Sequence, residues 1–434
     1  MEGDLIITGG RPLNGTVRIP AAKNSVLPLL AASLLCSSPV RLRAVPELAD
    51  VDTSLQLLQS AGCEAGWQGS DIVVQGVPGV CRLGADAAAR MRASILFCAP
   101  LLVRLGRAET VLPGGCRIGA RPVDLHLSGL AQMGAVCRAE GERLIITAPS
   151  GLHGAEITLR FPSVGATETL LLAAAAAQGK TVLRGAAREP EIVDLAAFLN
   201  RCGACVQGAG SSTIRVEGRR SLSGCSFAPM ADRIVASTFA CACAAAGGRV
   251  ELTGCAPEIY RPLLEILEQM GCGVKYGPES VVVSRFGRLH GAGKVFTGVY
   301  PALATDAAPL LAAAMLTADS ESSIEDVVFE RRFACAEGFA AFGGRVCTEG
   351  RTLCILPCTG LKGANTAAPD LRGGAALVIA ALAAQGKSRV TNTALIDRGY
   401  AGFAPMLAEL GSEIRRETRP SDGTEKKRHA KNQF

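Results

Sequence analysis

The sequence has little of what several protein classes require. Its four histidines do not pair with cysteines at the spacing of a metal site, so no zinc site is expected. The longest apolar stretches, residues 169–177 and 375–384, are far shorter than the roughly 18 residues of a membrane-spanning helix. No Walker or dinucleotide-binding glycine motif lies between a strand and a helix. A membrane span, a metal centre and a bound dinucleotide are therefore not expected.

Cysteine is abundant, but its distribution does not indicate disulfides. The seventeen cysteines are odd in number and irregularly spaced, which is typical of free thiols in a reducing compartment. Acidic residues stand at positions 2 and 4, where a signal peptide needs a basic segment. Apolar residues make up 48% of the chain, too many for a disordered protein. We expect a folded, soluble protein of the cytoplasm.

The net charge of +6 is concentrated at the end of the chain. Residues 413–434 hold seven basic and four acidic residues, which is half of that net charge. Residues 416–434 show no apolar periodicity, so a disordered basic tail is predicted there. No aromatic residue is interleaved with the basic ones to stack on bases, and a nucleic-acid partner is not expected.

An internal repeat organises the chain. Each copy has an apolar residue, a second apolar residue three positions later, and then a glycine that is expected to end a helix. These glycines lie at regular separations of 72, 69, 68, 72 and 68 residues, at Gly62, Gly134, Gly203, Gly271, Gly343 and Gly411. This regular spacing over six copies predicts six structural units.

Each unit also contains a helix that is apolar nearly all round, which indicates burial on all sides. These helices are predicted over residues 23–35, 91–105, 166–177, 232–246, 306–316 and 371–384. Short β-branched runs, such as 181–183 and 213–216, complete a β-α-β-α-β-β unit. Six units exceed one core, so we expect an α/β fold of two domains with three repeats each, helices inside and sheets outside. The break is expected near residues 227–229.

Charged residues recur where the buried helices begin. Lys23, Arg92, Arg233 and Arg372 stand at such positions, and Arg121, Arg188, Arg332 and Arg398 precede the second helix of a unit. Helix N-termini favour anions, so this pattern predicts an anionic substrate in the cleft between the domains. The alternative is that each arginine merely caps a helix or forms an ion pair.

One loop differs from the rest of the chain. Residues 113–122 place Cys116 among three glycines and two prolines, with Arg117 and Arg121 nearby, which favours a reactive thiol on a mobile lid. The Cys202–Cys205 pair matches a redox spacing. However, Cys202 occupies an apolar position of the repeat, so we interpret it as a core residue.

Several motifs together resemble a known family. They are Ala22-Lys23-Asn24, Met91-Arg92-Ala93-Ser94, the Cys116 loop continuing into Arg121-Pro122-Val123-Asp124-Leu125-His126, Ser163-Val164-Gly165, Thr305-Asp306, Asp370-Leu371-Arg372 and Asp397-Arg398-Gly399-Tyr400. From about Asp4 to Arg415 the chain resembles the UDP-N-acetylglucosamine 1-carboxyvinyltransferase family of enolpyruvyl transferases. The resemblance implies two inside-out α/β domains, a discontinuous one of residues 1–20 and 230–415 and a second of residues 21–229.

The resemblance also implies a reaction and its residues. The enolpyruvyl group of phosphoenolpyruvate is transferred to the 3′-hydroxyl of UDP-N-acetylglucosamine in the first committed step of peptidoglycan synthesis, without metal or organic cofactor. Cys116 would protonate C3 of phosphoenolpyruvate and Asp306 would accept the sugar proton, while Lys23, Arg121 and Arg398 would hold phosphate and carboxylate. Further substrate contacts are expected from Asn24, Arg92, Pro122, Val123, Asp124, Leu125, Ser163, Val164, Gly165, Val328 and Arg372.

Some positions depart from the family pattern and leave alternatives open. Ala21 replaces a common glycine, Ala304 a common proline, and Arg331 a common asparagine, while Val235 to Ser237 replace an acid and a glycine. A related transferase acting on shikimate 3-phosphate lacks the cysteine loop, which argues against that reading. A non-catalytic paralogue that binds the nucleotide sugar is a second alternative, and an RNA-end-processing enzyme is a third that lacks the histidine motif it would need.

Overall fold

The computed structural model describes residues 3–111 and 123–418. The predictions made for Cys116, Arg121, Pro122 and residues 419–434 lie outside the described residues. Within them, no helix is both long enough and apolar enough to cross a bilayer.

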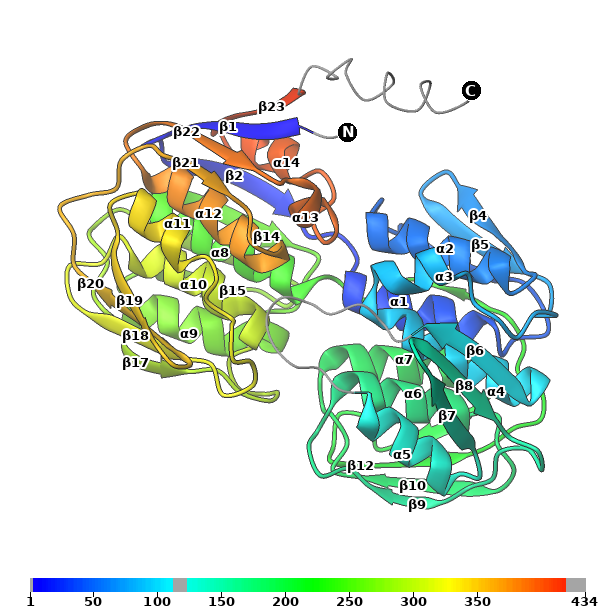
Figure 1. The fold of residues 1–434 in the computed structure, drawn as a ribbon. Coiled ribbons are helices and arrows are strands. Elements are labelled where there is room, and N and C mark those ends of the chain that lie inside the picture. Colours follow the sequence, from blue (N-terminus) through cyan, green and yellow to red (C-terminus); the bar gives the residue numbers. More distant parts are fainter. Residues whose placement is uncertain (1–2, 112–122, 419–434) are drawn as a thin grey trace, which may run out of the picture.

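The chain forms two lobes, each around its own apolar core (Figure 1). The core of lobe 1 is built from residues between Val26 and Leu222. The core of lobe 2 combines an N-terminal segment, Leu5 to Ile19, with residues between Ile234 and Leu410. We define the lobes by these cores; the domain boundaries expected at residues 20/21 and 229/230 stay predictions.

Three buried helices form the centre of each lobe. In lobe 2 they are α8 (Arg233–Ala246), α10 (Ala308–Met315) and α12 (Leu371–Ala383), which pack against one another. In lobe 1 they are α1 (Lys23–Ser33), α4 (Cys98–Leu105) and α6 (Val164–Ala174). The six predicted apolar helices are thus confirmed. Two of them differ at the start, since 3₁₀ turns η1 (Arg92–Phe97) and η3 (Thr305–Ala307) precede α4 and α10.

A second set of helices carries the repeat glycines. These helices are α2 (Ala49–Ser60), α5 (Asp124–Gln132), α7 (Pro190–Arg201), α9 (Arg261–Gln269), α11 (Ala336–Ala341) and α14 (Phe403–Glu409). All six signature glycines have φ between 85° and 101°, a left-handed conformation that glycine adopts without strain. The residue before each glycine is fully buried, as the repeat predicts. Short helices α3 (Ala85–Arg90), η2 (Pro257–Tyr260) and α13 (Ala394–Asp397) complete the set.

Six small sheets cover the outside of the helices (Figure 1). In lobe 1 their strand orders are β13 (Ser226–Phe227), β3 (Val40–Leu42), β5 (Asp71–Gln75), β4 (Glu64–Gln68); then β6 (Arg107–Val111), β8 (Arg143–Thr147), β7 (Val136–Glu140); and β11 (Cys205–Gln207), β12 (Thr213–Glu217), β10 (Lys180–Arg184), β9 (Glu156–Thr158). In lobe 2 they are β21 (Asn365–Ala367), β22 (Gly386–Thr391), β1 (Gly3–Gly9), β23 (Glu413–Thr418); then β15 (Gly273–Tyr276), β16 (Ser280–Arg285), β14 (Gly248–Thr253), β2 (Leu13–Arg18); and β17 (Gly293–Phe296), β18 (Ser322–Glu325), β20 (Thr352–Leu356), β19 (Arg345–Glu349).

The prediction of disorder from residue 416 is wrong for residues 416–418. They belong to β23, which pairs antiparallel with β1 from Gly3↔Thr418 to Thr8↔Glu413. Main-chain hydrogen bonds hold this strand, so it needs no apolar periodicity. In addition, Arg416 pairs with Asp397 through two hydrogen bonds of 2.6 and 2.8 Å.

The chain crosses between the lobes at two adjacent points. Ala22 N donates to Met230 O at 2.7 Å, and Asp232 N donates to Pro20 O at 2.8 Å. Ala21 and Ala231 therefore lie side by side in an antiparallel bridge. This arrangement brings the first residues of α1 and α8 together at the junction between the lobes.

Candidate active site

Asp50 joins the two lobes at the junction. It lies in α2 of lobe 1, and its Oδ2 is 2.7 Å from Lys23 Nζ at the start of α1. Its Oδ1 accepts a 2.9 Å hydrogen bond from Nε of Arg398, which belongs to lobe 2. Burial lowers the pKa of Lys23, against the opposing effect of Asp50, and Arg372 and Arg398 lower it further. Lys23, Arg372 and Arg398 thus place their positive charges near one another.

Asp306 is held by two arginines of its own lobe. Arg332 pairs with its Oδ1, and Arg372 Nε donates to its Oδ2 at 3.1 Å. Burial raises the pKa of Asp306, but the two arginines outweigh it and hold that pKa well below its usual range. The Asp306 side chain is 30% exposed, whereas those of Arg332 and Arg372 are 2% and 3% exposed. The carboxylate is therefore ionised and accessible to solvent, whereas the two arginines that pair with it are buried.

Arg372 retains an unused hydrogen-bond donor. Its Nη1 is buried and has no hydrogen-bond partner among residues 3–111 and 123–418. The guanidinium lies over the ring of Tyr400, 5.3 Å from the centroid, and Tyr400 OH is 2.8 Å from Thr238 Oγ1. A buried guanidinium with an unsatisfied donor is costly, and an anion would satisfy it.

A second buried ion pair connects the lobes beside this cluster. Arg233 of α8 donates from Nε to both carboxylate oxygens of Glu191 in α7, at 3.0 and 3.3 Å. Next to it, Asp232 caps α8 by accepting from the amides of Ile234 and Val235, and its other oxygen accepts from the amide of Lys23 at 3.3 Å. The starts of α1 and α8 are therefore connected through one carboxylate.

Most of the residues predicted to contact a nucleotide sugar lie in lobe 1. Ser163 caps α6 by accepting from the amide of Ala166, and Gly165 lies against His126 of α5. A Cβ at Gly165 would be 3.1 Å from His126 Cε1, so a side chain there would crowd the ring. His126 is buried beside Thr169 Oγ1 at 2.8 Å, and burial lowers its pKa to about 4. The histidine is neutral at physiological pH.

The other predicted contacts come from both lobes. Asn24 is exposed at the start of α1, and Arg92 begins η1 and acts electrostatically on His126. Val123 precedes α5, and Asp124 and Leu125 open it, with Asp124 paired to Arg160. Val164 is the first residue of α6, and Val328 donates its amide to Asp326 at 2.8 Å.

The structure places Lys23, Arg372 and Arg398 near one another, with Asp306 paired to Arg372. The sequence interpretation missed Asp50 as the partner of Lys23 and Arg398, and Glu191 as the partner of Arg233. A repeat alignment contains the signal, since each is the second residue of a signature helix, in α2 and α7. Among the departures, Ala304 has φ −62° and ψ 131°, a conformation that proline also adopts, so the approach to Asp306 keeps that backbone.

This junction is suited to a small anion. Ammonium and guanidinium groups bind phosphate and carboxylate, and the burial of Arg332 and Arg372 strengthens those interactions. Asp306 offers an ionised carboxylate beside them, which is the state that a proton acceptor needs.

Comparisons with known proteins agree with this reading. The model of the EPSP synthase (3-phosphoshikimate 1-carboxyvinyltransferase) family matches residues 7–407. UDP-N-acetylglucosamine 1-carboxyvinyltransferases from Nitratidesulfovibrio vulgaris and Acidiphilium cryptum are 42% and 43% identical to this chain, covering 95% and 94% of it and 99% and 98% of their own lengths. The same name is carried by a Finegoldia magna protein that is 42% identical over 93% of this chain and 96% of its own.

Solved structures show the same fold. The enolpyruvyl transferase NikO from Streptomyces tendae superposes with a TM-score of 0.85 at 27% identity, covering 96% of this chain and 100% of its own. EPSP synthase from Acinetobacter baumannii gives 0.72 at 18% identity with the same coverage, a likeness of fold alone. The two-lobed enolpyruvyl transferase fold is thus confirmed, and the chain belongs to the UDP-N-acetylglucosamine 1-carboxyvinyltransferase family.

Proposed function

We propose that this protein transfers the enolpyruvyl group of phosphoenolpyruvate to the 3′-hydroxyl of UDP-N-acetylglucosamine and releases phosphate. The observation that carries the proposal is the group of buried cations at the junction, beside an ionised Asp306. Within the described part of the chain, Nη1 of Arg372 has no hydrogen-bond partner. Family membership supplies the reaction class, and the relatives' names supply the acceptor. Membership of this family would place the reaction in peptidoglycan synthesis.

The roles we assign follow the charges at the junction. Lys23, Arg372 and Arg398 hold the phosphate and carboxylate of phosphoenolpyruvate, together with Arg121. Because Asp50 already pairs with Lys23 and Arg398, the incoming anion competes with this carboxylate for them. Asn24, Arg92, Val123 to Leu125, Ser163 to Gly165 and Val328 contact the nucleotide sugar.

The chemical step requires one proton acceptor and one proton donor. The 3′-oxygen of the sugar bonds to C2 of phosphoenolpyruvate while its proton passes to Asp306, and Cys116 delivers a proton to C3. The tetrahedral adduct then loses phosphate from C2 and a proton from C3, which restores the double bond. Because two arginines depress its pKa, Asp306 is a weak base in the substrate-free state. Anion binding to Arg372 would weaken that restraint.

The expected setting is the cytoplasm, where both substrates would be available. All sixteen cysteines of the described part of the chain are free thiols, which agrees with a reducing compartment.

The test is to mix the purified chain with phosphoenolpyruvate and UDP-N-acetylglucosamine and to measure phosphate release. We expect release that needs both substrates, that fosfomycin blocks by alkylating Cys116, and that is absent in Cys116→Ser. Shikimate 3-phosphate is the control acceptor, because the matching family model carries the name of the shikimate enzyme. If phosphoenolpyruvate released phosphate with shikimate 3-phosphate but not with UDP-N-acetylglucosamine, the proposed acceptor would be wrong. Nucleotide-sugar binding without any release would identify a binding paralogue.

A further inference from the structure

Two cysteines face each other on the hairpin of β19 and β20. The strands are joined by the two-residue turn Gly350–Arg351, and Gly350 has a φ of 62° that suits glycine. This short turn sets the register, which pairs Cys347 directly with Cys354 and Glu349 with Thr352. In an antiparallel pair, directly opposed residues have Cβ atoms roughly 4.5–5.5 Å apart. The register of the hairpin therefore places the two thiols next to each other.

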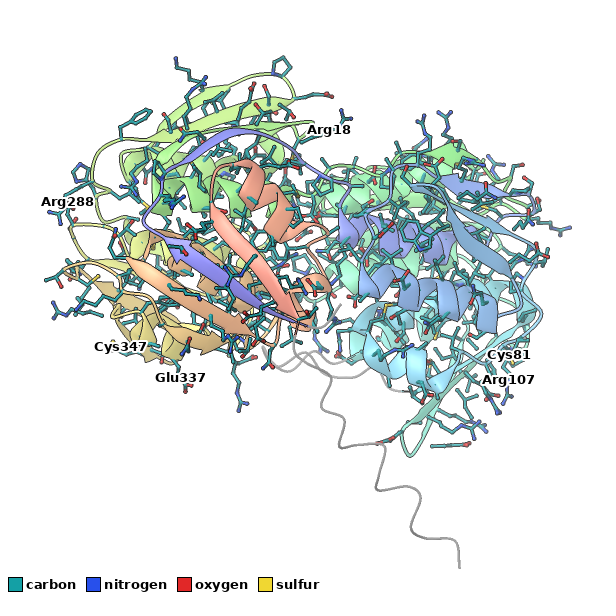
Figure 2. All side chains as sticks on the ribbon, turned by 90° about the horizontal axis from the view of Figure 1, so that it is seen from above. Arg18, Cys81, Arg107, Arg288, Glu337 and Cys347 are labelled. Carbon is teal, nitrogen blue, oxygen red and sulfur yellow. The ribbon has the colours of Figure 1, made fainter. Side chains whose placement is uncertain are left out.

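These side chains point away from the core. Leu353 and Ile355 are buried in the core of lobe 2, and side chains alternate between the two faces of a strand. Cys354 lies between them in β20 and so belongs to the outer face, together with its partner Cys347, which is exposed. Figure 2 shows Cys347 on the outer side of its lobe, remote from the junction. The pair is therefore separate from the proposed active site.

A carboxylate completes the group. Glu349 is two residues after Cys347 on the same strand and hence on the same face. One ligand atom from each of Cys347, Glu349 and Cys354 lies within 4.8 Å of both others. Over residues 3–111 and 123–418, this is the only group of three histidine, cysteine or acidic side chains that meets this condition.

The ligand atoms are not engaged elsewhere. Both cysteines are free thiols, and the Glu349 carboxylate makes no hydrogen bond or ion pair with any residue that the structure describes. The nearby Arg351 instead pairs with Glu330 at 2.9 Å and donates to Val327 O at 3.1 Å. An unpaired carboxylate beside two thiols leaves a surface position that a cation can occupy without displacing a basic side chain.

We propose that Cys347, Glu349 and Cys354 form a surface site for one Zn²⁺ ion. Zinc accepts cysteine sulfur and carboxylate oxygen in a tetrahedral arrangement, and three protein ligands leave the fourth position to water. Two sulfur ligands disfavour Mg²⁺ and Ca²⁺, which prefer oxygen ligands. The proposal does not depend on the proposed enzymatic function.

Cobalt is the spectroscopic probe for this site. The reduced, metal-free full chain is titrated with Co²⁺ anaerobically, and thiolate-to-cobalt absorption in the near ultraviolet is recorded. We expect one Co²⁺ per chain, displaced by Zn²⁺ and unaffected by excess Mg²⁺. Cys347→Ser and Cys354→Ser should each lose the absorption band, and Glu349→Gln should weaken binding while retaining a band.

Two matched variants serve as controls. Cys81→Ser removes a partly exposed thiol of lobe 1, and Cys116→Ser removes the proposed catalytic thiol; both should keep the band. Circular dichroism verifies that each variant is folded. No band in the wild-type chain, or a band that persists in Cys347→Ser, would overturn the proposal. So would a Cys347–Cys354 disulfide found by mass spectrometry in a chain whose reduced form takes up no metal.

Discussion

The two lobes contribute opposite charges to their junction. Lobe 1 presents a set of acids with one lysine, namely Asp50, Glu168, Glu189, Glu191 and Asp194 with Lys23. Lobe 2 presents four arginines and two acids, namely Arg233, Arg332, Arg372 and Arg398 with Asp232 and Asp306. Burial raises the pKa of Glu168, Glu189 and Asp194, because these carboxylates have lost water without gaining enough positive charge.

This difference separates two kinds of ion pair. Asp306 is neutralised within its own lobe, whereas Glu191 depends on Arg233 of the other lobe. Asp50 pairs with Lys23 of its own lobe and also with Arg398 of the other lobe. The first kind persists when the lobes separate, and the second does not. The pKa of Asp306 should therefore depend on lobe 2 alone. The acids of lobe 1 determine how closely the two lobes approach each other.

The largest expected effect comes from the carboxylate that is neutralised within its lobe. Asp306→Asn should lower kcat by about 10²–10⁴-fold, because a proton acceptor contributes on that order, with a small change in affinity for the nucleotide sugar. Steady-state kinetics and isothermal titration separate the two effects. The control is Asp319→Asn, because Asp319 pairs with His290 outside the junction. A loss confined to affinity would contradict the assigned role.

The buried pair between the lobes should dominate stability. Glu191→Gln leaves Arg233 without its charged partner and should reduce the free energy of unfolding by about 3–5 kcal/mol. Urea unfolding measures this value. The exposed pair of Arg351 and Glu330 is the matched control, since Glu330→Gln should cost less than about 1 kcal/mol. Equal losses in both variants would remove the distinction between the lobes' two kinds of pair.

A smaller effect is expected where a lobe 2 arginine serves both substrate and junction. Arg398→Lys keeps the positive charge but loses the guanidinium group that donates two hydrogen bonds to Asp50. The substitution should raise KM for phosphoenolpyruvate about tenfold. Combining it with Asp50→Asn in a double-mutant cycle tests whether the two act together. Additive effects would show that the anion does not compete with Asp50 for this arginine.

The smallest effect concerns the neutral histidine of lobe 1. The pKa of His126 is about 4 in the fold and about 6.5 when unfolded, so the unfolded chain binds more protons between these values. Its contribution to stability is complete above pH 6.5 and is lost as the pH falls towards 4. Between pH 7 and pH 5 the loss should be about 1–2 kcal/mol relative to His126→Gln, measured by urea unfolding. A pH-independent difference between the two proteins would mean that His126 does not titrate on unfolding.

Patterns that are local in sequence were predictable. The six buried helices follow from their apolar surfaces, and the signature glycines from the need for a left-handed residue at a helix end. Resemblance to a family identified Lys23, Asp306, Arg372 and Arg398, and the structure brings these four together. The roles assigned to these four residues, and those assigned to Cys116, Arg121 and Pro122, stay predictions.

Residue pairs that only the folded chain brings together could not be predicted from their spacing in the sequence. Asp50 and Arg398 are 348 residues apart, and only the docking of two lobes makes them neighbours. Strand β23 was missed because main-chain pairing with β1 holds it. Cys347 and Cys354 came together through a hairpin register that their spacing does not specify.

The pairing of β1 with the end of the chain has a consequence for synthesis. Thr393 Oγ1 donates to Gly3 O across 390 residues, and β1 lies between β22 and β23 in its sheet. A ribosome makes β1 first and both of its neighbours last, whereas the core of lobe 1 is complete by residue 222. Lobe 1 can therefore fold on the ribosome while β1 still has two open edges, and unpaired edges invite association with other chains. Strand β1 is thus made long before either of the strands that pair with it.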